Sequence, residues 1–410
     1  MKTRSLLYAV IGFLCSLQPA VIQAADWPGY RGSVTDGVST ENLNLNWSAS
    51  PPKVLWKVPT KSGFGSFSVC GGKVFTEVER SINGASHEVC VALDPATGKE
   101  LWFADLGVGN GNSTPAESDG VVCVLTKDLV LHALDAATGN SLWTHDLIKE
   151  YAAHNIGWES AASPVIDGDL VFVMGGGDGQ SLLAFNKKSG ELGWKTGTEA
   201  ITHATPVLAT ILGERQVIFF CQSGLVSLST KDGKLLWKFP YKFKTSTAAS
   251  PVVSGDIVYC SAGYDVGGGA CKIARQGSGF TATQLWQTPG NLEVANHWST
   301  PVCRDGYLYG MFSFKQEKVG PLKCVEIATG KVMWVQSGFG QGNAIVAGGK
   351  VLALSDKGDL VVVEPAPDAY KELGRFTVVK GDCRSTPAVS NGCIYVRSSE
   401  EGACIDVSAP

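Results

Sequence analysis

The sequence has few charged residues and few methionines. Charged side chains make up 18% of its 410 residues, and there are four methionines. Beyond the first 25 residues no stretch keeps an apolar periodicity of 3.6 residues, which excludes long amphipathic helices. Glycine is abundant, with 49 residues, and frequent glycine is typical of chains with many turns between short strands. This composition predicts an all-β protein.

The sequence also lacks a basic cluster. Its formal charge is −4, which becomes −6 when Lys2 and Arg4, the two cations of the first 24 residues, are set aside. Neutralisation of phosphates supplies most of the affinity for nucleic acid, so an acidic chain of this kind is not expected to bind it. The same negative charge argues against binding to an anionic membrane surface.

No segment after the N-terminus is long and apolar enough for a transmembrane helix. Residues 1–24 are typical of a signal peptide, with Lys2 and Arg4 before the apolar residues 6–17 and a cleavage point after Ala24. An uncleaved anchor is the alternative. Cys15 follows Leu14, where a lipidation signal has Gly or Ala, so we expect a protein that is exported to the periplasm or cell surface without a lipid anchor.

Cysteines are spaced neither as metal ligands nor as adjacent pairs. Eleven follow the signal region, and the absence of C-x-x-C spacing predicts no metal site. Most lie in apolar runs, which favours buried small hydrophobic residues. An odd number leaves at least one thiol unpaired within the chain. The best candidate disulfide joins Cys260 and Cys271, which flank a glycine-rich hairpin.

One repeated motif reads apolar-Asp-x-x-Thr-Gly-x-x-Leu-Trp. Clear copies run through residues 93–102 and 134–143. The sequence Asp-x-x-Thr-Gly predicts a tight turn, because Asp accepts hydrogen bonds from the backbone that follows and Gly tolerates a positive φ. The aromatic residues that end the eight copies are Trp56, Trp102, Trp143, Trp194, Trp237, Trp286, Trp334 and Phe376.

A second motif reads Ser/Thr-Pro-apolar, then a glycine turn, then β-branched and aromatic residues. Weaker copies without proline span residues 66–76 and 343–354. The clear copies begin at Thr114, Ser163, Thr205, Ser250, Thr300 and Thr386. Together the two motifs give eight sets of four short strands, with about 45 residues in each set.

This pattern predicts an eight-bladed β-propeller of four-stranded antiparallel blades. The large aromatics are expected to fill the gaps between blades. The chain ends on residues 403–407, a third strand without a fourth, and residues 53–57 form a fourth strand without a third. Pairing these ends would close the ring, whereas an open β-solenoid would leave both unpaired. We therefore expect an extension over residues 25–50 and one propeller over residues 51–410.

The repeats resemble the PQQ-type (pyrroloquinoline quinone) propeller repeat over nearly the whole chain after the signal peptide. That family includes quinoprotein dehydrogenases and BamB, a lipoprotein of outer-membrane protein assembly. The segment 26–33, Asp-Trp-Pro-Gly-Tyr-Arg-Gly-Ser, resembles the start of exported PQQ-like propellers common in planctomycetes. The resemblance specifies a fold more than an activity.

The resemblance implies two functions of different classes. One is a non-enzymatic binding or scaffold protein of the cell envelope, similar to BamB, with a protein or glycan as partner. The other is an alcohol or sugar dehydrogenase with PQQ and Ca²⁺. Quinoprotein dehydrogenases usually have adjacent cysteines, Glu and Asn ligands for calcium and a catalytic Asp, and none of these can be placed on this sequence. We therefore expect a monomer without a cofactor and assign no catalytic residue.

Polar and aromatic side chains gather in the loops that precede the first strand of each blade. Such loops surround the axis on one face of a propeller, where a ligand pocket is favoured. We predict an axial pocket formed by His154, Trp158, Glu159, His203, His297, Trp298, Asn343 and Arg384. The alternative is that these side chains only plug the axial channel.

Overall fold

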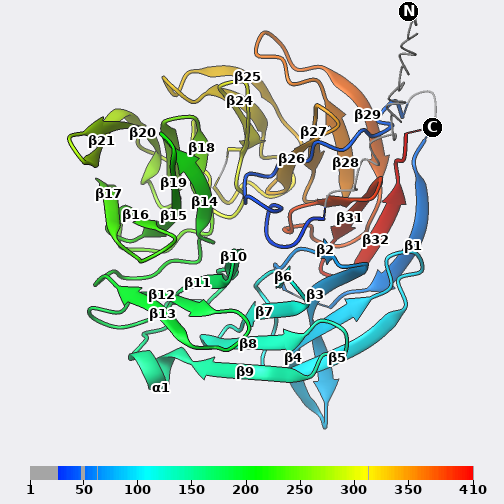
Figure 1. The fold of residues 1–410 in the computed structure, drawn as a ribbon. Coiled ribbons are helices and arrows are strands. Elements are labelled where there is room, and N and C mark those ends of the chain that lie inside the picture. The colour runs from blue at the N-terminus through cyan, green and yellow to red at the C-terminus, as the bar shows by residue number, and fades with distance from the viewer. Residues whose placement is uncertain (1–25, 48–50, 62, 313, 410) are drawn as a thin grey trace, which may run out of the picture.

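The computed structural model describes residues 26–47, 51–61, 63–312 and 314–409. Eight four-stranded sheets surround a central axis (Figure 1). Strands within each sheet pair antiparallel, and the first strands of neighbouring blades contact one another at the centre. The predicted all-β, eight-bladed propeller is confirmed.

Each of the first four blades runs outward in chain order. Their strands are β2 (Ser68–Cys70), β3 (Lys73–Ile82), β4 (Ala85–Leu93), β5 (Glu100–Val108), β6 (Ala116–Ser118), β7 (Val121–Leu125), β8 (Val130–Asp135), β9 (Ser141–Asp146), β10 (Val165–Asp167), β11 (Leu170–Met174), β12 (Leu182–Asn186), β13 (Leu192–Thr196), β14 (Val207–Ile211), β15 (Glu214–Cys221), β16 (Gly224–Ser229) and β17 (Leu235–Pro240). A single short helix, α1 (Leu147–Tyr151), is found in the described part of the chain, after β9.

The next three blades repeat this order and the eighth combines both ends of the chain. Their strands are β18 (Val252–Ser254), β19 (Ile257–Ala262), β20 (Gly267–Gln276), β21 (Gly279–Thr288), β22 (Val302–Arg304), β23 (Tyr307–Met311), β24 (Leu322–Glu326), β25 (Val332–Gln336), β26 (Asn343–Ala347), β27 (Lys350–Leu354), β28 (Asp359–Val363), β29 (Glu372–Thr377), β30 (Ala388–Ser390), β31 (Cys393–Arg397), β32 (Glu401–Asp406) and β1 (Lys53–Pro59).

The predicted closure of the ring is confirmed. Strand β1 pairs antiparallel with β32, with Lys53 opposite Asp406 and Trp56 opposite Cys404. The eighth sheet therefore has the order β1-β32-β31-β30, and its outermost strand comes from the start of the propeller. Because the ring is closed, every blade has a neighbouring blade on each side.

The Asp-x-x-Thr-Gly turn joins neighbouring blades. Asp94 Oδ1 accepts hydrogen bonds from the Ala96 and Thr97 amides, and Gly98 has a φ of +71°. Trp56 of the preceding blade packs beneath this glycine and donates from Nε1 to the Pro95 carbonyl at 2.8 Å. The same glycine-on-indole packing occurs for Gly139 on Trp102, Gly190 on Trp143, Gly233 on Trp194 and Gly330 on Trp286.

A small residue lies opposite the tryptophan in seven blades. A register shift interrupts the pairing of the third and fourth strands beside this position. The residues opposite the tryptophans are Ala92, Ala133, Ala184, Ser227, Ala270, Cys324 and Cys404. Eight of the eleven described cysteines are buried. Cysteine is thus used at Cys324 and Cys404 as a small apolar residue that makes room for an indole ring.

Two blades depart from the repeat. In the fifth blade, β20 and β21 are ten residues each and meet at a tight turn between Gln276 and Gly279, so no Thr-Gly turn faces the preceding tryptophan. Accordingly Trp237 donates instead to Gln216 Oε1 within its own blade, at 2.7 Å. In the seventh blade, the position beside the register shift that holds the tryptophan in the other blades is Gly374, opposite Val362, and Trp47 packs against it. Phe376 lies two residues further along the strand, opposite Leu360.

The extension 26–47 runs through the centre of the ring (Figure 1, dark blue). Trp27 pairs with Val69 of β2, and the Ser39 amide donates to Val346 of β26. Between them Arg31 is buried, and its guanidinium donates to the carbonyls of Thr300 and Ala344 at 3.0 and 3.2 Å. The extension therefore contacts blades on opposite sides of the axis.

Candidate functional site

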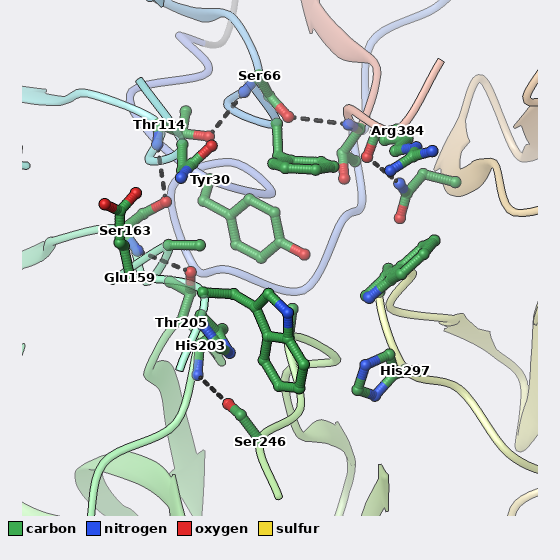
Figure 2. A pocket seen from close by; sticks show the side chains of 18 of the residues that line it. Tyr30, Ser66, Thr114, Glu159, Ser163, His203, Thr205, Ser246, His297 and Arg384 are labelled. Carbon is green, nitrogen blue, oxygen red and sulfur yellow. Dashed lines mark hydrogen bonds between the residues drawn. The ribbon is translucent and has the colours of Figure 1, made fainter. Parts of the chain in front are cut away.

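A belt of hydrogen bonds positions the loops around the axis. The Ser66 amide donates to Thr114 Oγ1, the Thr114 amide to Ser163 Oγ and the Ser163 amide to Thr205 Oγ1, at 2.9–3.0 Å (Figure 2). The Thr386 amide donates to Ser66 Oγ at 2.8 Å across the point of closure. The hydroxyls of Thr114, Ser163, Thr205 and Thr300 therefore tie their blades to the preceding ones. Ser250 Oγ, in the same motif, is buried without a partner.

Above this belt lies a cavity of about 630 Å³ at the axis. It is lined by the loops that enter the first strands, together with Tyr264 and Lys315 from loops between second and third strands. Seven of the eight predicted pocket residues line it: Trp158, Glu159, His203, His297, Trp298, Asn343 and Arg384. We call this cavity and its lining the axial funnel.

His154 is the predicted pocket residue that does not line the funnel. It is exposed in the loop after α1, four residues before Trp158. Sequence position placed it among the loop residues, but α1 turns this part of the loop away from the axis. Its role as a ligand residue has no support in the geometry.

An exposed tryptophan stands at one side of the funnel. Trp158 is 70% exposed, and its ring stacks on Tyr264 with centroids 6.3 Å apart. Trp158 and Glu159 both have a positive φ, +70° and +65°. Non-glycine residues in this region are strained by about 1–3 kcal/mol each and are concentrated at functional sites.

Local contacts hold this strained loop in place. The Glu159 carboxylate accepts from Lys127 Nζ at 2.9 Å, and the Ser160 amide donates to the Lys127 carbonyl. Asn155 Nδ2 donates to the same carbonyl at 2.8 Å. Lys127 therefore neutralises the carboxylate and anchors the loop on both sides of the tryptophan.

Two histidines lie in the funnel wall in their neutral form. Burial, with smaller contributions from His203 and Lys315, lowers the pKa of His297 to about 4. Burial also lowers the pKa of His203, whose Nε2 atom is buried without a hydrogen-bond partner. Near neutral pH both rings therefore offer hydrogen bonds rather than positive charge.

Positive charge comes instead from Arg384 and Lys315. The Arg384 guanidinium lies over the Trp298 ring at 4.9 Å and over the Phe64 ring at 5.4 Å. Asn343 Nδ2 donates to the Arg384 carbonyl at 2.8 Å and so fixes its backbone. Lys315 Nζ lies 5.1 Å from the Tyr264 ring.

The extension supplies the floor of the funnel. Tyr30 lines it (Figure 2). The Tyr30 hydroxyl is 3.0 Å from Thr300 Oγ1. Tyr30 was not predicted as a site residue, because it precedes the repeats by more than twenty residues. The adjacent Arg31 could have served as a signal, since an arginine among apolar and small residues must find many acceptors when buried.

The candidate disulfide is not formed in this structure. Cys260 and Cys271 are both free and buried. The register of β19 and β20 places Cys260 opposite Gly269 and Cys271 opposite Val258, so the two thiols are diagonal neighbours rather than partners directly across the hairpin. In the described residues no group of three or more His, Cys, Asp or Glu side chains is arranged to hold a metal ion.

Comparisons with known proteins agree with this architecture. The family described as outer membrane protein assembly factor BamB matches residues 85–306. The structure of BamB from Moraxella catarrhalis is similar, with a TM-score of 0.61 at 17% identity, over 88% of this chain and 98% of that chain. Among proteins with curated functions, none matches this chain in sequence.

Enzymes and a designed protein share the fold as well. Quinohemoprotein alcohol dehydrogenase from Comamonas testosteroni has a TM-score of 0.66 at 12% identity, over 94% of this chain and 81% of that chain. The computationally designed Ika8 protein has a TM-score of 0.57 at 14% identity, over 91% of this chain and 99% of that chain. At these identities the likeness shows the fold and does not distinguish a scaffold from an oxidoreductase.

Proposed function

The chain belongs to the PQQ-repeat propeller family described as outer membrane protein assembly factor BamB, and from that membership we propose that it is a non-enzymatic binding protein of the cell envelope. Its axial funnel is the binding site, and the partner is an envelope protein or glycan. The observation that carries the proposal is a preformed, aromatic-lined cavity whose loops are tied together by the Ser/Thr belt.

A preformed cavity favours binding because little order has to be gained when a ligand enters. The belt fixes the loop backbones, and the strained Trp158 is already exposed toward solvent at the rim. Neutral histidines and aromatic faces are suited to recognition by stacking and hydrogen bonds. They are less suited to acid–base catalysis, since a general base works best with a pKa near the operating pH.

Location in the envelope follows from the predicted signal peptide, residues 1–24, which lies outside the described residues. The described helix α1 is too short to cross a membrane, and no other described segment is a helix of sufficient length. The similar protein named BamB is an outer membrane protein assembly factor, which supports a partner in the same compartment. We propose that this chain acts there as a monomer.

The residues of the funnel do not fit the calcium ion that a quinoprotein dehydrogenase requires. Calcium takes six to eight oxygen ligands, preferably with several carboxylates. Glu159, the carboxylate in the funnel lining, is paired with Lys127. Both polar atoms of the Asn343 side chain already form hydrogen bonds. Oδ1 accepts from the Thr300 amide, and Nδ2 donates to the Arg384 carbonyl. This donor set supports the binding function over the oxidoreductase.

Capture from envelope extracts tests the proposal. Purified protein is immobilised and incubated with detergent-solubilised envelope proteins and, separately, with envelope glycans. The double variant His297→Ala/Trp298→Ala should lose the component that the unmodified protein retains. Leu142→Ala, an exposed change on the outer strand β9, serves as a control and should retain it. Equal capture by all three proteins would refute the axial funnel as the site.

A second experiment addresses the oxidoreductase directly. The protein is incubated with PQQ and Ca²⁺, and its absorbance and dye-linked oxidation of alcohols and sugars are measured. We expect neither quinone absorbance after gel filtration nor dye reduction. Quinone retention together with dye reduction would replace the binding function with a dehydrogenase.

A further inference from the structure

The axial funnel combines stacking faces with one accessible guanidinium. The Arg384 guanidinium is held between Trp298 and Phe64, and its ion pair with Glu317 is long, at 3.6 Å, with a Glu317 side chain that is 58% exposed. Exposed pairs of this kind contribute little. The flat fork of the guanidinium therefore remains available to bind a carboxylate with two parallel hydrogen bonds.

The charge of the funnel differs from that of the whole molecule. The chain has a formal charge of −4. In the funnel lining, Arg384 and Lys315 supply two cations and Glu159 the one carboxylate. Outside the lining, Lys127 pairs with Glu159 at 2.9 Å, whereas Glu317 is 3.6 Å from Arg384. The funnel is thus a positive site on an acidic protein, and such a site selects an anionic ligand.

The remaining lining groups are neutral and suited to hydroxyl groups. Asn110, Asn112 and Ser246 line the cavity beside the two neutral histidines. Amide, hydroxyl and imidazole groups form hydrogen bonds without carrying a charge, as recognition of hydroxyl groups requires.

We infer that the ligand of the axial funnel is an acidic saccharide, a sugar chain with a carboxylate on its pyranose rings. Trp158 and Trp298 offer faces on which the apolar sides of sugar rings stack, Arg384 binds the carboxylate, and the asparagines and histidines bind hydroxyls. A planar aromatic acid would use the guanidinium and the indoles but leave the hydroxyl-binding groups unused. This inference rests on the proposed binding function and names its ligand class.

A pair of matched probes tests the inference. Galacturonic acid trimer and its trimethyl ester differ only in the charge and the methyl group of their three carboxyls. Binding of both is measured by titration calorimetry and by tryptophan fluorescence. We expect the acid to bind at least tenfold more tightly than the ester. Arg384→Gln should weaken binding of the acid at least tenfold and leave the ester unchanged, while Trp298→Ala should weaken both. The control Arg304→Gln changes an exposed side chain at the end of β22 and should change neither.

The other outcomes separate failure of the inference from failure of the proposed function. Equal binding of acid and ester, both reduced by Trp298→Ala, would overturn the acidic class and keep the funnel as a binding site. Binding of the acid that neither Arg384→Gln nor Trp298→Ala reduces would place it outside the funnel and overturn both. If neither trimer binds but PQQ or an acidic peptide does, with loss in Arg384→Gln, the saccharide is wrong and the anion site stands. Thermal unfolding of each variant confirms that it is folded.

Discussion

The glycine that ends each Asp-x-x-Thr-Gly turn meets two separate requirements. At Gly139 the backbone has a φ of +76°, and a Cβ atom would come within 2.6 Å of the Trp102 ring in the preceding blade. The first requirement is local and belongs to the turn. The second comes from the neighbouring blade, so the same residue that shapes the turn also permits the blades to pack.

Replacement of Gly139 by alanine therefore tests the packing requirement. We expect Gly139→Ala to lower the free energy of unfolding by about 2–4 kcal/mol, the sum of backbone strain and displacement of the indole. Gly255→Ala is the matched control, since Gly255 has a φ of +60° and no atom within 4 Å of the added Cβ. The control should lose only about 1–2 kcal/mol. Urea unfolding measures both, and equal losses would show that the indole contact contributes nothing.

Two buried glutamates make stability depend on pH. Glu77 and Glu88 are both buried and lie as diagonal neighbours on the paired strands β3 and β4. Burial raises the pKa of both carboxyls, that of Glu88 to about 8. The folded state thus keeps a proton that the unfolded chain releases near pH 4.5. The stability that this neutral form contributes is complete below that pH and is lost as the pH rises toward 8.

The change Glu88→Gln should remove much of this dependence. Between pH 5 and pH 8 the free energy of unfolding is expected to fall by about 1.4 kcal/mol per pH unit for each retained proton. In Glu88→Gln the slope should be shallower, so the variant gains on the unmodified protein as pH rises. Denaturant unfolding at several pH values measures the slopes, with the exposed Glu191→Gln as control. Parallel slopes in all three proteins would contradict a proton retained at Glu88.

At the scale of elements, the extension 26–47 acts as an internal brace. Arg31 donates to the carbonyls of Thr300, Pro301, Ala344 and Asp36, which brings the sixth and seventh blades to the extension. Because these acceptors are buried or nearly so, the guanidinium satisfies groups that water cannot easily reach. The brace also carries Tyr30 to the funnel floor.

Loss of the Arg31 side chain should affect the ring and the funnel together. We expect Arg31→Ala to lower the free energy of unfolding by about 3–5 kcal/mol, since several buried carbonyls lose their donor. The exposed Arg304→Ala, whose ion pair with Asp305 lies at the surface, should cost less than about 1 kcal/mol. Guanidinium chloride unfolding compares the two, and similar losses would show that the extension does not brace the ring.

The blade elements could be predicted from sequence, because each repeats the same local chemistry. The strands, their order and their closure were predicted from turn residues, alternating apolar runs and the aromatic residue at the end of each copy. The path of the extension could not be predicted from sequence. Its contacts are isolated interactions with blades that are distant in sequence, such as the bridge between Trp27 and Val69. In the funnel, loop position identified seven lining residues. It misplaced His154, because α1 redirects its loop, and it missed Tyr30.

Contacts between separate blades also explain why the role of some motif residues was not predicted. Ser or Thr before proline was a repeat marker in sequence, and its hydroxyl proves to accept from the amide of the preceding blade. Gly139 was expected for its turn and not for the Trp102 ring below it. Contacts between blades follow from the ring as a whole, so one repeat read alone does not reveal them.

For the whole molecule, closure makes the two ends of the chain one structural unit. Strand β1 is the outermost strand of the eighth blade, and Trp56 on it packs against Tyr395 of β31 and beneath Gly98 of the first blade. The strand therefore connects the eighth blade to the first. In a ring, loss of one such connection opens the sheet edge of β32 and weakens both neighbouring blades.

Deletion of residues 51–59 should consequently destabilise all eight blades rather than one end. We expect a single unfolding transition at a melting temperature lower by ten degrees or more, because the deletion removes the Trp56 packing and the pairing with Glu401–Asp406. A permuted chain that carries residues 51–59 after the C-terminus, joined by a flexible linker, restores β1 beside β32 and should recover most of the loss. Calorimetry compares the three proteins. A deletion that keeps the original melting temperature, or a permuted chain that recovers nothing, would mean that the ring does not depend on this strand for closure.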